Sequence, residues 1–365
     1  MKRVLHIVNR MGYGGIEAFL MNLYRNIDRK KVQFDFAVHT KKKGEYDKEI
    51  KKLGGNIYYF TSRKDNLFEY YKDWNNFLKN NAKNYSTIHM HVSSLTTIMP
   101  LVLAKKYNIK NRIIHAHNTF QKGKIHKILS NINKKRIRKY ATKLFACSTE
   151  AGNYVYGNNN YENINNGIDL EKYKFNIEKR KYKRKELNIK SDETVYINIG
   201  RLTEEKNQVY LLSIFKEIYK HDNKSKLFII GKGKLKSKIE NEIKEMHLEE
   251  QVILLEGRSD IPEILQAVDI FLLPSLYEGL PVVAIEAQAS GLKCFISKNV
   301  SPEVKLSNLV DFLDINKSPK EIAEYILKNK SYERNNKIDI NLEKYDIVKI
   351  VEYLLKNIYI IKSFI

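Results

Sequence analysis

Strand-like and helix-like segments alternate along most of the chain, and this alternation constrains the fold more than any other feature of the sequence. It begins with the apolar run 2–8, KRVLHIV, followed by a glycine-rich turn and a segment whose apolar residues recur at helical spacing. Parallel strands need a long crossover between them, and a helix usually provides it. The alternation therefore predicts an α/β fold in which helices cover parallel sheets.

The pattern starts a second time at residues 194–200, TVYINIG, and continues with further strands and helices. We therefore expect two sequential α/β domains rather than one large sheet. The segment 172–190 is rich in Lys and Arg and has no hydrophobic rhythm. We expect this segment to be the linker between the domains.

A chain of 365 residues, 43% of them hydrophobic, is long enough for two buried cores. Its apolar runs are shorter than the roughly 18 residues of a membrane span, and residues 1–8 have too short an apolar core for a signal peptide. These features predict a soluble cytoplasmic protein. Cys147 and Cys294 lie in apolar strand-like runs, where we expect buried, reduced thiols.

The net charge of +23 is concentrated in the first half of the chain. Residues 1–170 hold 31 Lys and Arg against 12 Asp and Glu, whereas the remaining residues hold 34 against 30. Such asymmetry indicates an acidic partner for the first half, either nucleic acid or an anionic membrane surface.

The segment 122–143 contributes nine of these cations and no acidic residue. Its apolar residues at 125, 128, 129 and 132 form one helical stripe with cations around it. The pattern is typical of a helix that lies on a membrane surface, and an ordinary amphipathic helix packed on its sheet is the alternative. The cations that we assign to a membrane or acceptor side are Lys124, Lys127, Lys134, Lys135, Arg136 and Arg138.

The stretch 272–291, LLPSLYEGLPVVAIEAQASG, places two glutamates near the carboxyl end of a buried strand. Pro274 ends that strand, and Pro281 suits the first position of a helix. Glu278 then lies in the loop and Glu286 inside the helix, at the edge where open α/β sheets bind ligands.

The amides of Gly279 and Leu280 would point out of the positive end of this helix, where they could bind phosphate. Glu286 is surrounded by apolar residues, and hydroxyl groups of a ligand could satisfy its carboxylate. The alternative is that Glu278 is an acid favoured at a helix start and that Glu286 is solvated.

Two further turns follow predicted strands. The turn GRLTEEKN places Arg201 and Lys206 beyond the second domain's first strand, where both cations would suit a diphosphate. The turn NRMGYGG places Gly14 and Gly15 before the first helix, although it lacks the third glycine of the dinucleotide fingerprint. Solvated surface cations and a plain tight turn are the respective alternatives.

Histidines recur in pairs on two predicted strands. His89 and His91 share one face, as do His115 and His117. We expect no metal, because there is no acidic cluster nearby and the sequence offers no obvious further ligands for a closed zinc site. The run HAHN at the end of its strand is the better candidate for a ligand contact.

Together these stretches resemble the retaining family-4 glycosyltransferases of the GT-B fold, especially the subgroup that builds bacterial exopolysaccharide and capsule. The resemblance covers nearly the whole chain and rests on GGIEAFL, HAHN, ATKLFACSTEAGNYVYG, NNGIDLEKY, GRLTEEKNQ and EGLPVVAIEAQASGL. It implies two Rossmann-like domains facing a cleft: an acceptor-side domain, 1–168, and a nucleotide-sugar-binding domain, 169–344. The last helix, 345–365, would pack back on the first domain.

By position, the resemblance assigns Glu286 to the ribose hydroxyls of the nucleotide and Glu278 to the donor sugar. It assigns Arg201 and Lys206 to the diphosphate. The implied catalytic residues are His117, Glu278, Arg201 and Lys206. The implied donor-binding residues are Gly14, Gly15, Arg201, Lys206, Glu278, Gly279, Leu280 and Glu286. His91 and Arg258 are carried over only as residues that could line the cleft.

The resemblance implies transfer of a sugar from a nucleotide-diphosphate sugar, UDP-linked by analogy, to a lipid-linked saccharide at the inner face of the cell membrane. Two protein cations would do the work of a divalent ion, so we expect neither a metal nor another cofactor. The alternatives are a sugar-nucleotide epimerase of the same fold and a basic nucleic-acid-binding protein. Epimerases lack the pairing of GRLTEEKN with Glu-x7-Glu, and no base-reading module is visible in the sequence.

Overall fold

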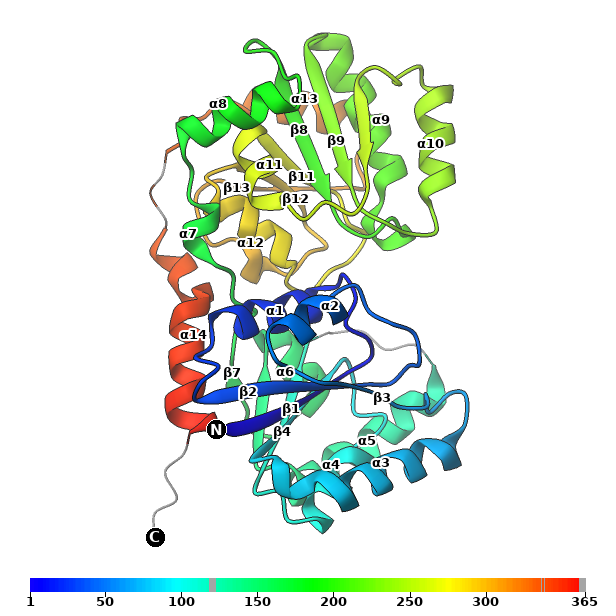
Figure 1. Cartoon of the computed structure of the whole chain (residues 1–365). Coiled ribbons are helices and arrows are strands. Elements are labelled where there is room, and N and C mark those ends of the chain that lie inside the picture. Colours follow the sequence, from blue (N-terminus) through cyan, green and yellow to red (C-terminus); the bar gives the residue numbers. More distant parts are fainter. Residues whose placement is uncertain (118–122, 336, 338, 361–365) are drawn as a thin grey trace. The chain divides into compact units, whose positions relative to one another are not determined.

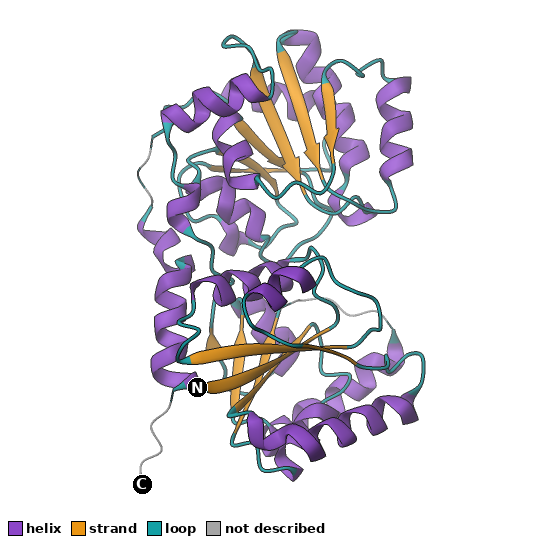
Figure 2. Cartoon of the chain, viewed as in Figure 1, coloured by secondary structure: helices purple, strands orange, loops and turns teal. Residues whose placement is uncertain are grey.

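A computed structural model describes residues 1–117, 123–335, 337 and 339–360. The chain forms two compact units, a first unit of residues 1–168 with 344–365 and a second unit of residues 169–343. Each unit contains a parallel β-sheet with helices on both of its faces (Figures 1 and 2). The α/β fold with two Rossmann-like sheets, predicted from the alternation of strands and helices, is confirmed.

The sheet of the first unit has seven parallel strands in the order β3-β2-β1-β4-β5-β6-β7. The order reverses between β1 and β4, and crevices at such a reversal bind ligands in open α/β sheets. The strands are β1 (Lys2–Val8), β2 (Val32–Val38), β3 (Ile57–Tyr59), β4 (Thr87–Val92), β5 (Asn111–Ala116), β6 (Lys143–Ala146) and β7 (Glu162–Asn163).

Two apolar layers hold the helices of the first unit against its sheet. Trp74 and Leu101 belong to the layer on one face, whereas Phe19 and Tyr359 belong to the layer on the other. On the first of these faces lie α3 (Leu67–Asn81), α4 (Met99–Lys106), α5 (Lys124–Tyr140) and α6 (Thr149–Tyr156). On the second lie α1 (Gly15–Asn26), α2 (Asp47–Lys52), α14 (Ile347–Leu354) and the π-helical turn η5 (Leu355–Tyr359).

The sheet of the second unit has six parallel strands in the order β10-β9-β8-β11-β12-β13, with the reversal between β8 and β11. The strands are β8 (Thr194–Ile199), β9 (Ser225–Ile230), β10 (Val252–Leu255), β11 (Ile270–Leu273), β12 (Lys293–Ser297) and β13 (Val310–Leu313). The helices are α7 (Leu170–Tyr173), α8 (Ile177–Glu186), α9 (Gln208–His221), α10 (Lys236–Glu245), α11 (Ile261–Ala267), α12 (Val282–Ala289) and α13 (Pro319–Asn329).

The segment expected to be a linker instead forms part of the second unit as helix α8. Asn176 caps the start of α8, since its side chain accepts a hydrogen bond from the Lys179 amide at 2.9 Å. Lys183 and Arg184 in this helix are buried. The expectation of a solvated linker was wrong because these cations have partners that lie far away in the sequence.

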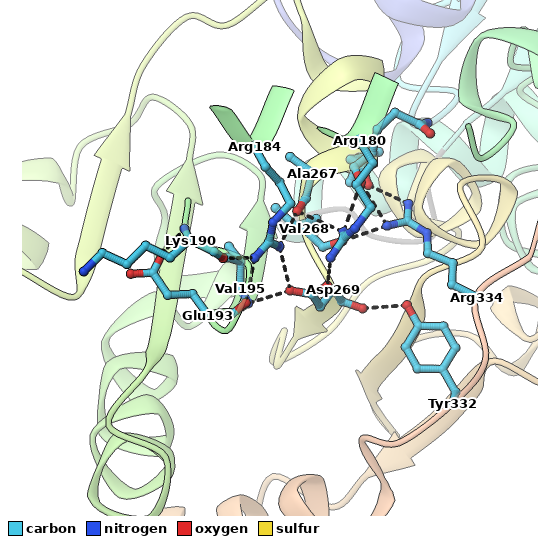
Figure 3. Close-up of polar contacts among 12 residues, drawn as sticks. Arg180, Arg184, Lys190, Glu193, Val195, Ala267, Val268, Asp269, Tyr332 and Arg334 are labelled. Atoms are coloured by element: carbon cyan, nitrogen blue, oxygen red, sulfur yellow. Dashed lines mark hydrogen bonds and ion pairs between the residues drawn. The ribbon is translucent and has the colours of Figure 1, made fainter. Parts of the chain in front are cut away.

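Those partners are carbonyl and carboxylate oxygens at the junction of α11 and β11 (Figure 3). Arg184 Nη1 donates to the Ala267 carbonyl oxygen at 3.0 Å and to Asp269 Oδ2 at 3.3 Å. Arg180 Nη2 lies 2.6 Å from Asp269 Oδ1. Arg334 Nη2 lies 2.7 Å from Leu265 O. The guanidinium groups therefore satisfy the carbonyls that end α11 and fix the start of β11, the strand that precedes Glu278.

None of the helices in the described part of the chain combines the length and the apolar character that crossing a bilayer requires.

Candidate functional site

The turn after β8 and the loop after β11 are tied together at the carboxyl edge of the second sheet, where the strand order reverses. The Lys206 ammonium forms an ion pair with Glu278 Oε1, and both side chains are largely buried. Ser275 Oγ donates to the same carboxylate oxygen at 3.2 Å. The amide of Leu276 donates to the Glu205 carbonyl at 2.8 Å, so backbone contacts support the ion pair.

Glycine at position 200 allows the side chain of Lys206 to lie across the end of β8. A Cβ at Gly200 would lie 3.1 Å from Lys206 Cε. The Arg201 side chain, in contrast, is exposed, and no described residue accepts a hydrogen bond from its guanidinium. At this edge Lys206 is therefore held in position by its ion pair, whereas Arg201 is available to a ligand.

The turn 231–233 contacts this edge from the next strand. A Cβ at Gly231 would lie only 1.8 Å from the Gly200 carbonyl oxygen, and the Leu202 amide donates to the Lys232 carbonyl at 2.9 Å. These glycines allow two backbones to pack closely, which is a structural role.

Glu286 lies in the second turn of α12, and Tyr173 on α7 donates a hydrogen bond to its Oε1 at 2.8 Å. Burial raises the pKa of Glu286 to about 7, and the hydrogen bond from Tyr173 opposes that rise only in part. The sequence does not predict Tyr173 as a partner of this carboxylate. Its only signal was its place at the end of the stretch NNGIDLEKY.

The loop between Glu278 and α12 is anchored to the end of β12. The Ser301 amide donates to the carbonyls of Glu278 and Gly279, at 3.1 and 3.3 Å. No described residue accepts a hydrogen bond from the amides of Gly279 or Leu280, so both remain able to bind a ligand. Pro281 is the N-cap of α12 rather than its first helical residue, one position away from the expectation.

In the first unit, Gly14 is the N-cap of α1 and Gly15 is its first residue, so both glycines lie at a helix start after β1, as the sequence predicted. A Cβ at Gly14 would lie 2.3 Å from Glu17 Oε2. The absence of a side chain at Gly14 therefore lets the Glu17 carboxylate fold back over the positive end of the helix.

Five histidines from three neighbouring strands lie side by side beneath α1 and η5, and we call them the histidine array: His6, His89, His91, His115 and His117. Nδ1 of His91 lies 2.9 Å from Nε2 of His117, and Nε2 of His91 lies 3.1 Å from Nδ1 of His6. Burial lowers the pKa of His117 to about 3, so its ring is neutral at pH 7.

The array corrects one expectation. The two histidine pairs do share a face, but the sequence analysis found no further nitrogen ligands near them, and that was wrong. His6, on β1, is the register partner of His89 and completes the row. It was missed because the position of β1 beside β4 depends on strand order, which local spacing does not encode.

Arg258 is engaged in a structural ion pair. Its Nε lies 2.7 Å from Asp260 Oδ1, and Lys183 pairs with the same carboxylate.

Helix α5 presents its apolar stripe outward. Ile125, Ile128, Leu129 and Ile132 are 73%, 59%, 36% and 48% exposed, whereas Ser130, Asn133 and Ile137 are buried. Asn133 Nδ2 donates to the Leu95 carbonyl at 2.7 Å, so polar groups hold the inner face. The helix packs on the sheet through Ile137, whereas the apolar stripe itself does not.

Two of the six cations assigned to the membrane side form hydrogen bonds to neighbouring segments. Lys134 Nζ donates to the Tyr154 carbonyl at 2.6 Å, and Arg138 donates to the Asn160 carbonyl. Exposed side chains remain at Lys124, Lys127, Lys135 and Arg136.

Two hollows in the second unit lie at the amino ends of its strands. One is lined by His221, Asp222, Glu324, Leu327 and Lys330, and the other includes Asp192, Thr194 and Asp269. Ligands of open α/β sheets bind at the opposite edge, so neither hollow is the candidate site.

Comparisons with known proteins agree with this geometry. A model described as Glycosyltransferase Family 4 matches residues 13–172, and one described as Glycosyl transferases group 1 matches residues 179–344. EpsF of Bacillus subtilis, whose name assigns it to the glycosyltransferases, is 34% identical over 83% of this chain and 81% of its own length.

Two other relatives have more specific names. An Escherichia coli UDP-Gal:alpha-D-GlcNAc-diphosphoundecaprenol alpha-1,3-galactosyltransferase is 40% identical over 37% of this chain and 35% of its own length. The capsular polysaccharide biosynthesis glycosyltransferase CapH of Staphylococcus aureus is 26% identical over 96% of this chain and 98% of its own length.

The crystal structure of Anabaena HepE in complex with UDP-glucose superimposes with a TM-score of 0.74 at 17% identity, covering 97% of this chain and 98% of HepE. Two Rossmann-like units, each with a parallel sheet, and this likeness define the GT-B fold. The family models and the similarity to EpsF make the assignment more specific: the chain belongs to the family-4 glycosyltransferases.

Proposed function

We propose that this glycosyltransferase moves a sugar from a UDP-linked donor to a lipid-linked saccharide in exopolysaccharide or capsule synthesis, with retention of anomeric configuration. The observation that carries the proposal is the ion pair between Lys206 and Glu278 at the switch point of the second sheet, together with the buried Glu286 in the helix that follows the Glu278 loop. The names of the relatives from E. coli and S. aureus and the UDP-glucose bound to HepE support this choice of donor and pathway.

In this proposal the donor diphosphate binds beside Arg201 and Lys206, and the amides of Gly279 and Leu280 contribute at the start of α12. The bond between the anomeric carbon and the diphosphate oxygen breaks, so negative charge develops on the diphosphate and positive charge on the sugar ring. The cations and amides stabilise the first charge, and Glu278 stabilises the second. The acceptor hydroxyl attacks from the face that the diphosphate leaves, which preserves the configuration.

We propose that the reaction needs no metal ion, because two protein cations can neutralise the leaving diphosphate. Lys206 already has its position, since Glu278 holds its ammonium and Gly200 leaves room for its aliphatic chain. Replacing either Lys206 or Arg201 by alanine should lower kcat about 100- to 1000-fold, the usual cost of removing one group that stabilises developing charge.

The first unit would supply the acceptor side. Gly14 and Gly15 would contact phosphate or acceptor, and His117 would contact the donor sugar. The neutral ring of His117 can exchange hydrogen bonds with sugar hydroxyls, but it adds no charge at pH 7. His117 therefore positions the sugar in this proposal rather than stabilising the diphosphate.

We further propose that α5 holds the enzyme on the anionic inner face of the cell membrane, close to lipid-linked acceptors. An exposed apolar stripe flanked by exposed cations is the arrangement by which a helix lies in a membrane surface. Nucleic acid is not expected as a partner, because an outward apolar stripe suits lipid rather than phosphate backbone.

A thermal-shift screen against UDP, GDP, ADP and CMP sugars tests the donor site, since a ligand that binds only the folded protein raises its Tm. We expect a UDP-sugar to give the largest shift and Glu286→Ala to abolish it. Glu249→Ala, an exposed acid in the same unit, is the matched control and should keep the shift. The donor assignment fails if no nucleotide sugar shifts the Tm, or if Glu286→Ala retains the shift.

The pKa of Glu286 gives a second test. If the carboxylate accepts hydrogen bonds from ribose, donor affinity should fall as the pH drops from 8 to 6, because the group becomes protonated near pH 7. Glu286→Gln should bind more weakly at pH 8 and lose most of this pH dependence. Titration calorimetry with UDP measures both effects.

Product analysis separates the chemical alternatives. Incubation with the donor alone should slowly release free sugar and UDP if the chain is a transferase, whereas interconversion of the sugar would indicate an epimerase. With a lipid-linked acceptor, NMR of the anomeric proton of the product should show the donor's configuration, and the opposite configuration would contradict retention.

A further inference from the structure

We propose that three members of the histidine array, His91, His115 and His117, form a binding site for a divalent transition-metal ion of the zinc type. One nitrogen of each of these rings lies within 4.8 Å of the others. A metal with nitrogen ligands at about 2.0–2.1 Å brings those nitrogens to roughly 3.3 Å from one another, so the widest of these separations would have to close by up to about 1.5 Å.

Strand pairing sets this geometry. His91 and His115 are direct register partners on β4 and β5. His117 follows at the end of β5, and the centroid of its ring lies 4.1 Å from that of His115. Three imidazoles are thus held by the sheet itself, which positions metal ligands more accurately than loops do.

The protonation of His115 is fixed by its surroundings. Nε2 of His115 lies 3.1 Å from the Ile164 carbonyl oxygen, which can only accept a hydrogen bond, so Nε2 carries the proton. Its Nδ1 is then a bare lone pair, and this buried nitrogen has no hydrogen-bond partner among the described residues. A buried lone pair without a donor is costly, and a metal ion would satisfy it.

In each of the other two rings, as in His115, one nitrogen would bind the metal and the other would carry the proton. When Nδ1 of His91 binds metal, its Nε2–H can donate to Nδ1 of His6, 3.1 Å away. When Nε2 of His117 binds metal, its Nδ1–H faces the side chain of Asn166, whose Oδ1 is otherwise unpaired. Histidines that ligate metals characteristically donate their other N–H to an acceptor. Nε2 of His115 and Nε2 of His91 have such a neighbour, whereas Nδ1 of His117 has no hydrogen-bond partner among the described residues.

The donor set selects the kind of ion. Three neutral imidazoles without a carboxylate suit Zn²⁺, Co²⁺, Ni²⁺ or Cu²⁺ and do not suit Mg²⁺ or Ca²⁺, which prefer oxygen ligands. His117 is the one partly exposed ring of the three.

The site shares His117 with the proposed contact to the donor sugar, although the proposed sugar transfer itself uses no metal. An occupied site would hold that ring in place through its Nε2.

The test is a titration of the metal-stripped protein with ZnCl₂, followed by calorimetry and thermal shift. We expect one Zn²⁺ per chain and a rise in Tm. His115→Gln should weaken binding by more than the 10- to 100-fold that loss of an outer hydrogen-bond partner usually costs. His39→Gln is the matched control, because His39 packs against Tyr70 and Trp74 in the same unit, away from the array, and should leave binding unchanged.

His117→Ala is a second variant at a less buried position and should also lose the ion. Circular dichroism of the metal-free variants establishes that both are folded. Co²⁺ substitution should give the strong visible absorption of a four- or five-coordinate nitrogen site, which octahedral Co²⁺ on surface residues does not give.

Absence of Zn²⁺ binding to the folded wild-type protein would overturn the proposal. So would binding that persists in both variants, because the ion would then sit elsewhere. Imidazole ¹⁵N shifts that stay unchanged on addition of Zn²⁺ would mean that the array is only a chain of hydrogen-bonded neutral rings.

Discussion

Helices α5 and α8 are both rich in lysine and arginine, yet the structure uses their cations in opposite ways. In α8, Arg180 and Arg184 turn inward to the carbonyls and the carboxylate at the junction of α11 and β11. In α5, Lys135 and Arg136 are exposed beside an outward apolar stripe. The cations of one helix hold its unit together, whereas the other helix leaves cations and an apolar stripe exposed.

The difference shows that composition alone does not reveal the role of a basic segment. The α8 sequence IEKRKYKRKE has a single apolar residue besides tyrosine, so nothing in its pattern announces a buried face. The α5 sequence has a clear apolar stripe, which in a globular protein usually faces the core, and here it faces outward. In both cases the partner groups on neighbouring elements decide the orientation.

The largest expected effect comes from removing an inward cation. Arg184→Ala leaves the Ala267 and Glu193 carbonyls and the Asp269 carboxylate short of a donor. We expect a loss of about 3–5 kcal/mol in the free energy of unfolding, measured by urea denaturation. Arg136→Ala in α5 is the matched change and should alter this free energy by less than about 0.5 kcal/mol. If both variants lose the same free energy of unfolding, the cations of the two helices do not differ in their structural role.

The second expected effect concerns membrane binding by α5. Each basic residue near an anionic membrane contributes about 1 kcal/mol, so reversing Lys135 and Arg136 to Glu should weaken vesicle binding by at least about 30-fold. Co-sedimentation with phosphatidylglycerol vesicles measures this change. Lys238→Glu with Lys244→Glu on α10 applies the same change in charge to the second unit and should bind almost normally.

Replacing Ile128 and Ile132 by Asp tests the apolar part of the same surface. Both side chains are exposed, so stability should stay nearly unchanged while vesicle binding falls. Binding that survives both the charge reversal and these changes would rule out α5 as the membrane contact.

A smaller effect should appear in the stability of the fold at low pH, to which the contact between Asp260 and α8 contributes. Burial disfavours the charged form of Asp260, but hydrogen bonds from Arg258 and Lys183 outweigh it and lower the pKa to about 2. Because the folded pKa lies below the unfolded value, ionised Asp260 stabilises the fold above about pH 4, and this contribution is lost as the pH falls to 2. Asp260→Asn should therefore be destabilised by up to about 2 kcal/mol at pH 7 and match the wild type near pH 2. Urea unfolding at several pH values tests this convergence.

The smallest predicted effect is a difference in stability between variants of two neighbouring cations in α5. Lys134 Nζ donates to the Tyr154 carbonyl at 2.6 Å, so Lys134→Ala should cost about 1 kcal/mol of stability. Lys135→Ala should cost almost nothing. Thermal denaturation of the two variants compares them, and equal Tm values would contradict an anchoring role for Lys134.

Residue spacing alone was enough to predict the two parallel sheets and the local position of several candidate groups. The apolar runs and the crossover helices follow from periods of 2.0 and 3.6 residues, which are local properties of the chain. For the same reason the sequence placed Glu278 in a loop and Glu286 inside a helix, and Gly14 and Gly15 at a helix start.

Tertiary structure decided which side chains meet. Lys206 reaches Glu278 across 72 positions, and Tyr173 reaches Glu286 across 113. The row of histidines exists because β1 lies beside β4 and β4 beside β5. Strand order and register depend on the packing of the whole unit, so no local period encodes them, and the inward or outward direction of a basic helix depends on the same packing.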